Sequence, residues 1–229
     1  MKLLLLMALL FAGVTTTTLC AKEKKYKPSV VPKHMSVAEK KKRFFALLVP
    51  PVEHVHRELE RQYEEVKKDI QNHTNQAKIE ALKKKYNAKT DEDLLIAIKP
   101  HPMSIALAQA AMESAWGTSR FFREANNIFG VRSINPQQPR VAASETKGHN
   151  IVWVRKYNNL NQAIRDYYFM ISTIPQYKVL KTMNYEGKPS IQMIEGLKEY
   201  SERGDAYVKE LRSMIRYNKL TKYDTKVAK

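Results

Sequence analysis

The sequence contains a single cysteine, Cys20, among its 229 residues. A disulfide framework and a zinc site built from several thiolates are therefore excluded within this chain. The six histidines are scattered, and the closest pair, His54 and His56, would point to different faces of a helix. We accordingly expect no metal site and no cofactor.

The sequence has only one long apolar run, Leu3–Val14, and it follows the basic residue Lys2. This run is too short to cross a bilayer as a helix, and small residues follow it, so residues 1–21 are typical of a secretory signal peptide. Cys20 raises the alternative of a lipid anchor. The preceding Leu19 is larger than the residue normally found before a lipidated cysteine, which favours ordinary cleavage after Cys20 or Ala21.

Acidic residues are scarce: 23 stand against 40 lysines and arginines, which gives a net charge of +17. Without residues 1–21 the balance is 39 bases minus 23 acids, or +16. An exported protein this basic is expected to meet an anionic surface, such as cell-wall peptide carboxylates, lipid head groups or nucleic acid. Charge alone does not choose among them.

The N-terminal third of the chain is predicted to be helical and basic. A capping box, Ser36–Glu39, opens a helix that we expect Pro50 and Pro51 to end. Apolar residues then recur at spacings of three and four until Asn72–Asn75, and a lysine-rich helix follows to about Tyr86. Most simply this is a helical hairpin with a solvated basic face; a dedicated wall-binding or partner-binding arm is the alternative.

The rest of the chain alternates between helices and one short β-element. Thr90 caps a helix that ends at Pro100, and a second helix starts near Ser104 and is closed by Gly117. Residues 139–157 favour a small antiparallel hairpin. Helices are expected again at Leu160–Thr173, Ile191–Tyr200 and Tyr207–Asn218.

The most informative stretch is 104–131, SIALAQAAMESAWGTSRFFREANNIFGV. In its alanine-rich helix, Glu113 lies one position off the apolar stripe, with Gln109 and Trp116 expected on the same face. Apolar neighbours desolvate a carboxylate and raise its pKa, which is the condition that a general acid needs near neutral pH. An ordinary surface glutamate is the competing interpretation, although no lysine lies four residues further on.

Three segments carry a family resemblance: 109–119 (QAAMESAWGTS) with 126–131 (NNIFGV), 154–157 with 163–167, and 200–208 (YSERGDAYV). They resemble the mannosyl-glycoprotein endo-β-N-acetylglucosaminidase-like domain, the glucosaminidase family of bacterial peptidoglycan hydrolases, in its Bax-like branch. The resemblance is strong over residues 100–218. Residues 36–90 are similar to that branch through less distinctive motifs.

The resemblance implies an α+β, predominantly α, lysozyme-like fold with a small antiparallel β-lobe and an N-terminal helical extension. It implies cleavage of the β-1,4 bond after N-acetylglucosamine, with Glu113 at the catalytic acid position and Glu145, in the hairpin, as the second carboxylate. The expected organisation is residues 1–21 signal peptide, 22–90 leader and extension, 91–220 catalytic domain, and 221–229 tail.

Four aromatic residues are candidates for binding substrate. Tyr200 could hydrogen-bond the substrate's acetamido group, and Tyr207 is either a second such group or a core residue. The rings of Phe129 and Trp116 could stack on sugar faces, although the turn around Phe129 could equally be structural. Asp166 is expected to support Arg155 rather than to carry protons.

The mechanism stays open at this stage. Two carboxylates about 5 Å apart would indicate a covalent intermediate, about 6.5–9.5 Å would leave room for water, and the substrate's own acetamido oxygen could attack instead of Glu145. We expect an exported, periplasmic or cell-envelope enzyme that acts as a monomer on glycan strands, without nucleic acid or a stable membrane span. A lytic transglycosylase and a non-catalytic wall-binding protein are the alternatives.

Overall fold

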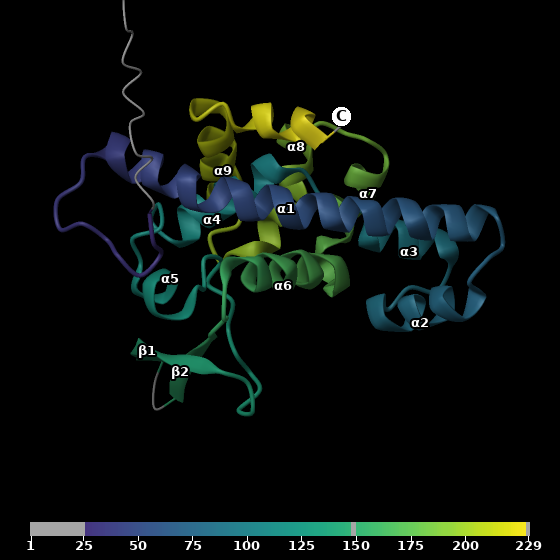
Figure 1. The fold of residues 1–229 in the computed structure, drawn as a ribbon, viewed down its shortest axis with the longest axis horizontal. Coiled ribbons are helices and arrows are strands. Elements are labelled where there is room, and N and C mark those ends of the chain that lie inside the picture. The colour runs from purple at the N-terminus through teal and green to yellow at the C-terminus, as the bar shows by residue number, and fades with distance from the viewer. Residues whose placement is uncertain (1–25, 148–149, 228–229) are drawn as a thin grey trace, which may run out of the picture.

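The computed structural model describes residues 26–147 and 150–227. The expected signal peptide and Cys20 lie outside this part. The described chain is mainly helical, with one two-stranded antiparallel sheet projecting from the helical body (Figure 1). The predicted α+β, predominantly α architecture with a small β-lobe is confirmed.

A single long helix, α1 (Val37–Gln71), runs along the whole body (Figure 1). It begins with the predicted capping box, in which Ser36 and Glu39 satisfy each other's backbone amides. The prediction that Pro50 and Pro51 end this helix is wrong, because both lie inside it. Each proline removes one helical hydrogen bond, yet Leu48 and Val52 on either side are fully buried, and this packing keeps the helix continuous.

The first half of α1 belongs to the main core. Phe44, Leu48, Val52 and Val55 are completely buried and pack with residues of α4 (Met103–Glu113), α6 (Leu160–Thr173) and α9 (Asp205–Tyr217). The N-terminal segment, which we expected to be an extension of the catalytic domain, therefore shares one hydrophobic core with it. Helix α6 occupies the residues predicted for it.

The second half of α1 forms a smaller cluster with α2 (Gln76–Tyr86) and α3 (Asp91–Ile98). Tyr63 and Val66 of α1 pack there against Ile79 and Leu94. The predicted turn after α1 and the Thr90 capping box of α3 are both present. This cluster extends the body away from the β-lobe (Figure 1).

The β-lobe consists of β1 (Arg140–Lys147) and β2 (Asn150–Arg155), which follow α5 (Arg120–Ala125). Arg140 pairs with Arg155 and Lys147 with Asn150, and the register is irregular between Ala142 and Thr146. The predicted hairpin is confirmed.

The C-terminal region wraps around α4. It comprises η1 (Pro175–Tyr177), α7 (Lys178–Tyr185), α8 (Ser190–Met193), η2 (Ile194–Tyr200), α9 and η3 (Leu220–Val227). The helix expected over residues 191–200 is thus mostly a 3₁₀ helix. We expected residues 221–229 to be a tail. Instead, η3 packs against α4, and Asp224 accepts hydrogen bonds from the backbone N–H and hydroxyl of Ser104, at 2.8 and 2.7 Å.

Arg43, on the buried face of α1, ties the leader to the end of α4. Its guanidinium donates to the carbonyl of Gly117 at 2.8 Å and to the carbonyls of Lys27, Pro28 and Val30 at 2.9–3.0 Å. Only 1% of this side chain is exposed. The segment that precedes α1 is therefore anchored to the helix that carries Glu113.

Across residues 26–147 and 150–227, no helix is both long enough and apolar enough to traverse a bilayer.

Candidate active site

Glu113 is the last residue of α4, the most deeply buried helix of the protein. Residues 103–111 are all buried, so the expected one-sided stripe is in fact buried on every side. The helix ends because Ala115, Trp116 and Gly117 adopt positive φ angles in succession, and the Ser114 hydroxyl bonds the carbonyl of Ala110 and the amide of Gly117. The chain turns away at this point and leaves the Glu113 side chain at the surface.

Glu113 borders a cleft of about 720 Å³. The walls come from the end of α4, the loop that precedes β1, the end of β2, the C-terminal end of α6 with η1, and the segment around Tyr200. The lining residues are Glu113, Phe129, Gly130, Val131, Arg132, Ile134, Arg155, Met170, Ile174, Tyr177, Glu199, Tyr200, Ser201, Glu202 and Arg203. Such a concave site can hold an extended ligand next to the carboxyl group of Glu113.

The surroundings of Glu113 favour its protonated form. Its carboxyl group is open to solvent in the cleft but is surrounded by protein atoms, and this desolvation raises its pKa. Two groups act in the opposite direction and lower the pKa: the neighbouring hydroxyl of Tyr207, which favours the carboxylate as a hydrogen-bond donor, and the positive charge of Arg203. The pKa remains above its ordinary value, as expected for a general acid.

Tyr200 and Tyr207 are stacked on each other, with ring centroids 5.6 Å apart, but they face different surroundings. Tyr200 borders the cleft, and its hydroxyl donates to the carbonyl of Phe129 at 3.2 Å. Tyr207 is fully buried between Gln109 and Glu113. Tyr200 is therefore placed to meet a ligand, whereas Tyr207 acts on Glu113 from behind.

The rings of Phe129 and Trp116 are not presented to the cleft. Phe129 borders it, but its ring is 3% exposed and stacks on Tyr167 with centroids 3.9 Å apart. Trp116 lies outside the cleft lining and packs edge-on against Phe44 and Phe45 of α1. The positive φ of Trp116 turns its indole away from the face of Glu113, where helical spacing placed it. Phe129 thus forms part of the cleft wall through packing on Tyr167, and Trp116 belongs to the core beside α1.

Glu145 lies in β1, within the irregular part of the register, and its side chain lies outside the described residues. The base of the hairpin is held firmly. Arg155 of β2 bonds both carboxylate oxygens of Asp166 at 2.7 Å, and the Tyr157 hydroxyl donates to the same group at 2.5 Å. The predicted support of Arg155 by Asp166 is confirmed.

Several cleft residues were not found by sequence reasoning. Arg203, Glu199 and Glu202 border the cleft next to Tyr200, and their proximity to that tyrosine in sequence was the available signal. Gly130 is a further case: Oε2 of Glu113 lies 3.8 Å from the position that a Cβ would take there, and the φ angle is +68°. The NNIFG turn thus leaves free space in front of the carboxyl group.

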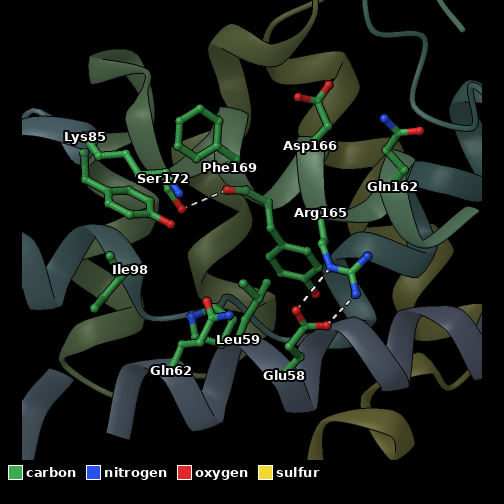
Figure 2. A pocket seen from close by; sticks show the side chains of 13 residues that line it. Glu58, Leu59, Gln62, Lys85, Ile98, Gln162, Arg165, Asp166, Phe169 and Ser172 are labelled. Atoms are coloured by element: carbon green, nitrogen blue, oxygen red, sulfur yellow. Dashed lines mark hydrogen bonds and ion pairs between the residues drawn. The ribbon is translucent and has the colours of Figure 1, made fainter. Parts of the chain in front are cut away.

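A second pocket, of about 400 Å³, lies between α1, α2 and α6 (Figure 2). Its Glu58 accepts hydrogen bonds from Arg165 at 3.3 and 2.6 Å, and this contact lowers the pKa of Glu58. The Lys85 ammonium lies over the Phe169 ring, 5.5 Å from its centroid. An ionised, paired carboxylate cannot serve as a proton donor, so this pocket lacks the property that distinguishes the Glu113 cleft.

A raised pKa alone does not identify the acid. Glu60 of α1 has a pKa of about 7, raised by burial and by the charge of Glu64, but it borders neither of these two pockets. Among the described residues, no group of three or more histidine, cysteine or acidic side chains could hold a metal ion. Glu113 combines the raised pKa with access to a cleft.

Comparison with known proteins places this geometry in a family. A family model described as mannosyl-glycoprotein endo-beta-N-acetylglucosaminidase matches residues 93–220, more than half of the chain. Protein bax of Escherichia coli is 28% identical over 123 residues, which cover 51% of this chain and 43% of that protein. The chain thus matches less than half the length of this curated relative.

Two solved structures are also similar. The truncated glycoside hydrolase domain of FlgJ from Salmonella typhimurium is 25% identical, with a TM-score of 0.42, and covers 56% of this chain and 90% of its own. The catalytic domain of the autolysin Auto from Listeria monocytogenes is 19% identical, with a TM-score of 0.46, and covers 84% of this chain and 100% of its own. By the family match over residues 93–220, which include Glu113 and its cleft, the chain belongs to the glucosaminidase family of glycoside hydrolases.

Proposed function

We propose that this chain is an exported hydrolase of bacterial peptidoglycan that cleaves the β-1,4 bond after N-acetylglucosamine, with Glu113 as the general acid. The observation that carries the proposal is the carboxyl group of Glu113: it faces the cleft, and its pKa is raised by desolvation. The match of residues 93–220 to the glucosaminidase family supports the reaction class.

In the first step, protonated Glu113 gives its proton to the glycosidic oxygen as the bond to the sugar breaks. The carboxylate that remains is stabilised by the neighbouring hydroxyl of Tyr207 and by the positive charge of Arg203. These groups favour the ionised form that proton transfer produces, while desolvation keeps the proton on the acid beforehand. The two influences together suit a group that must hold a proton and then release it.

The second step requires a group that completes the attack on the sugar. Glu145, which lies in the hairpin, could act as the base that activates a water molecule or as the nucleophile itself. Alternatively, the acetamido oxygen of the substrate could attack the anomeric carbon. Tyr200 is the side chain that we propose for the second route, because it borders the cleft. Glu199 and Glu202 border the same cleft and are the further carboxylates that mutagenesis should include.

The charge of the chain supports an anionic polymer as the substrate. The net charge is +17, and peptidoglycan carries peptide carboxylates along its glycan strands. Export, a periplasmic or cell-envelope location, and action as a monomer on glycan strands without nucleic acid belong to this proposal. The predicted signal peptide of residues 1–21 is the sequence feature that supports export.

The proposal is tested on purified sacculi with the wild type, Glu113→Gln and Glu145→Gln, and with the product ends identified by mass spectrometry. Glu113→Gln should lower kcat roughly 100- to 10,000-fold, because it removes the proton donor. Glu53→Gln is the matched control, since this glutamate of α1 pairs with Arg57 and lies outside the cleft lining.

Each outcome separates one alternative. Reducing N-acetylglucosamine ends support the proposed hydrolase, whereas anhydromuramic ends would instead identify a lytic transglycosylase. Full activity of Glu113→Gln in cells would favour a non-catalytic wall-binding protein. A large loss of activity in Glu145→Gln assigns the second step to that carboxylate, and small losses in Glu145→Gln, Glu199→Gln and Glu202→Gln assign it to the acetamido group.

A further inference from the structure

A row of buried polar side chains lies directly behind Glu113. Nε2 of His101 is 2.9 Å from the Tyr167 hydroxyl, which is 2.5 Å from Oε1 of Gln109, and Nε2 of Gln109 is 3.0 Å from the Tyr207 hydroxyl. Tyr207 lies next to Glu113 at the end of the row, where its hydroxyl lowers the pKa of that carboxyl group. The four side chains behind Glu113 are at most 3% exposed, so water does not compete for these bonds.

The hydrogen bonds of this row all run in one direction. Tyr167 has a single proton, which it donates to Oε1 of Gln109, so its oxygen accepts from Nε2–H of His101. The Gln109 amide donates to the Tyr207 oxygen, which leaves the proton of Tyr207 for Glu113. The opposite orientation of the amide would use the Tyr207 proton for Gln109 and leave Glu113 without this donor.

His101 is suited to fix this direction because it stays neutral. Burial lowers the pKa of His101 to about 3, and the neighbouring His56 also disfavours a charge on it. His56 in turn bonds the backbone carbonyl of His101 at 3.1 Å, and the Tyr168 ring packs against the imidazole at 4.5 Å. A neutral imidazole held in this way donates one hydrogen bond and supplies no charge.

We propose that His101 and Gln109 are positioning residues that act on Glu113 through Tyr207. The directed row His101–Tyr167–Gln109–Tyr207 points the O–H of Tyr207 towards the carboxyl group of Glu113 and fixes the orientation of that group. This inference deepens the proposed function and rests on Glu113 as its acid. Aligned donors strengthen one another at low dielectric, so a change at the distant end should be felt at the carboxylate.

Other groups that face Glu113 set the background for the test. Arg203 favours its ionised form, Glu210 opposes that form, and Tyr200 lies close enough to interact with its charge. Arg132, Arg155, Glu199 and Glu202 border the same cleft. The variants of the row leave these cleft residues unsubstituted. A shift in the pKa of Glu113 in such a variant therefore reports on the row.

The experiment measures the pKa of Glu113 by NMR of ¹³C-labelled glutamate side chains, with the resonance assigned through Glu113→Gln, together with the pH profile of kcat/KM. Tyr207→Phe removes the donor, so the pKa of Glu113 and the basic limb of the profile should move to higher pH. Gln109→Met and then His101→Leu should cause smaller shifts in the same direction. For Gln109→Met we expect kcat to fall about ten-fold with little change in KM.

Two further variants separate positioning from structure. His101→Gln retains an N–H donor and should restore the wild-type pKa, whereas His101→Leu should not. Tyr168→Phe deletes another buried hydroxyl, one that bonds the carbonyl of His101 at 3.4 Å outside the row, and should leave the pKa of Glu113 unchanged. If Gln109→Met does not fold, Tyr207→Phe and the His101 pair still decide the question.

An unchanged Glu113 pKa in folded Tyr207→Phe or Gln109→Met would overturn the inference. The NMR titration does not depend on catalysis. Two results together would therefore refute Glu113 as the acid but support the role of the row: the row variants shift the pKa of Glu113, and the Glu113→Gln variant remains active.

Discussion

The two structural sides of the Glu113 cleft are built differently. The helical side, α4 with η2 and α9, is embedded in the main core, and buried hydrogen bonds reach Glu113 from behind. The β-lobe projects from the body and is joined to it at its base (Figure 1). The proposed acid, Glu113, thus belongs to the side embedded in the core, whereas Glu145 belongs to the projecting lobe.

Substitution of Gly196 is expected to have the largest effect on stability, because the absence of a side chain there allows η2 to pack closely against α7. A Cβ at this position would lie 2.3 Å from the backbone nitrogen of Leu180, so Gly196→Ala must push η2 away from α7. We expect a loss of about 3 kcal/mol or more in the free energy of unfolding, measured by urea denaturation.

Gly187→Ala is the matched control for that substitution. Among the described residues nothing lies within 4 Å of the added Cβ, but the φ angle of +74° is unfavourable for alanine. About 1 kcal/mol of destabilisation is expected. Equal losses for the two variants would contradict the close approach of η2 to α7.

A drop in pH should weaken the helical side next. Burial lowers the pKa of His56 to about 4 and that of His101 to about 3, whereas both are near 6.5 when exposed. Between these values the unfolded chain binds more protons, so stability is retained above pH 6.5 and is lost as the pH falls. By linkage, going from pH 6.5 to pH 5 costs about 1.5 kcal/mol for each histidine. Glu60, which faces His56 and has its pKa raised to about 7, acts in the opposite direction and offsets about one histidine, because its folded form binds more protons over this range.

Urea denaturation at several pH values tests this expectation. The His101→Gln variant should lose less stability than the wild type over the same range, because one buried imidazole is gone. Identical pH dependence in both proteins would show that His101 does not contribute.

The smallest effect is expected at the base of the β-lobe. Asp166→Asn removes the charge that holds Arg155 and Tyr157, at a cost of about 1 kcal/mol because the ion pair is partly exposed. Hydrogen exchange should accelerate over 151–155 and stay unchanged in α4 and α9. The control, Glu53→Gln, removes an exposed ion pair on α1 and should affect neither region. Faster exchange in α4 as well would show that the two sides are coupled.

Local sequence signals predicted much of this architecture. The capping boxes at Ser36 and Thr90, the hairpin and α6 all depend on residues that are close in sequence, and each was found. Glu113 was singled out because of the motif around it, and its pKa is raised as expected. The physical reason differs in part, since the desolvated site is not made by the indole of Trp116.

Long-range packing decided the features that were missed. Pro50 and Pro51 interrupt hydrogen bonding locally, but burial of the residues around them keeps α1 helical. From the sequence, Phe129 and Tyr207 were candidates for binding substrate. Only the tertiary structure shows that Phe129 stacks on Tyr167 and that Tyr207 lies behind Glu113. The role of Gln109 depends on two tyrosines that are 58 and 98 residues away along the chain.

The continuity of α1 has a consequence for how this enzyme is divided. The segment matched by the family model starts at residue 93, but the fully buried side chains of Phe44, Leu48, Val52 and Val55 fill the core beneath the helix that carries Glu113. The segment that matches the family model is therefore smaller than the unit that packs around this core. An exchange of catalytic segments between family members would have to carry α1 along, because its inner face is the complementary surface on which that segment closes.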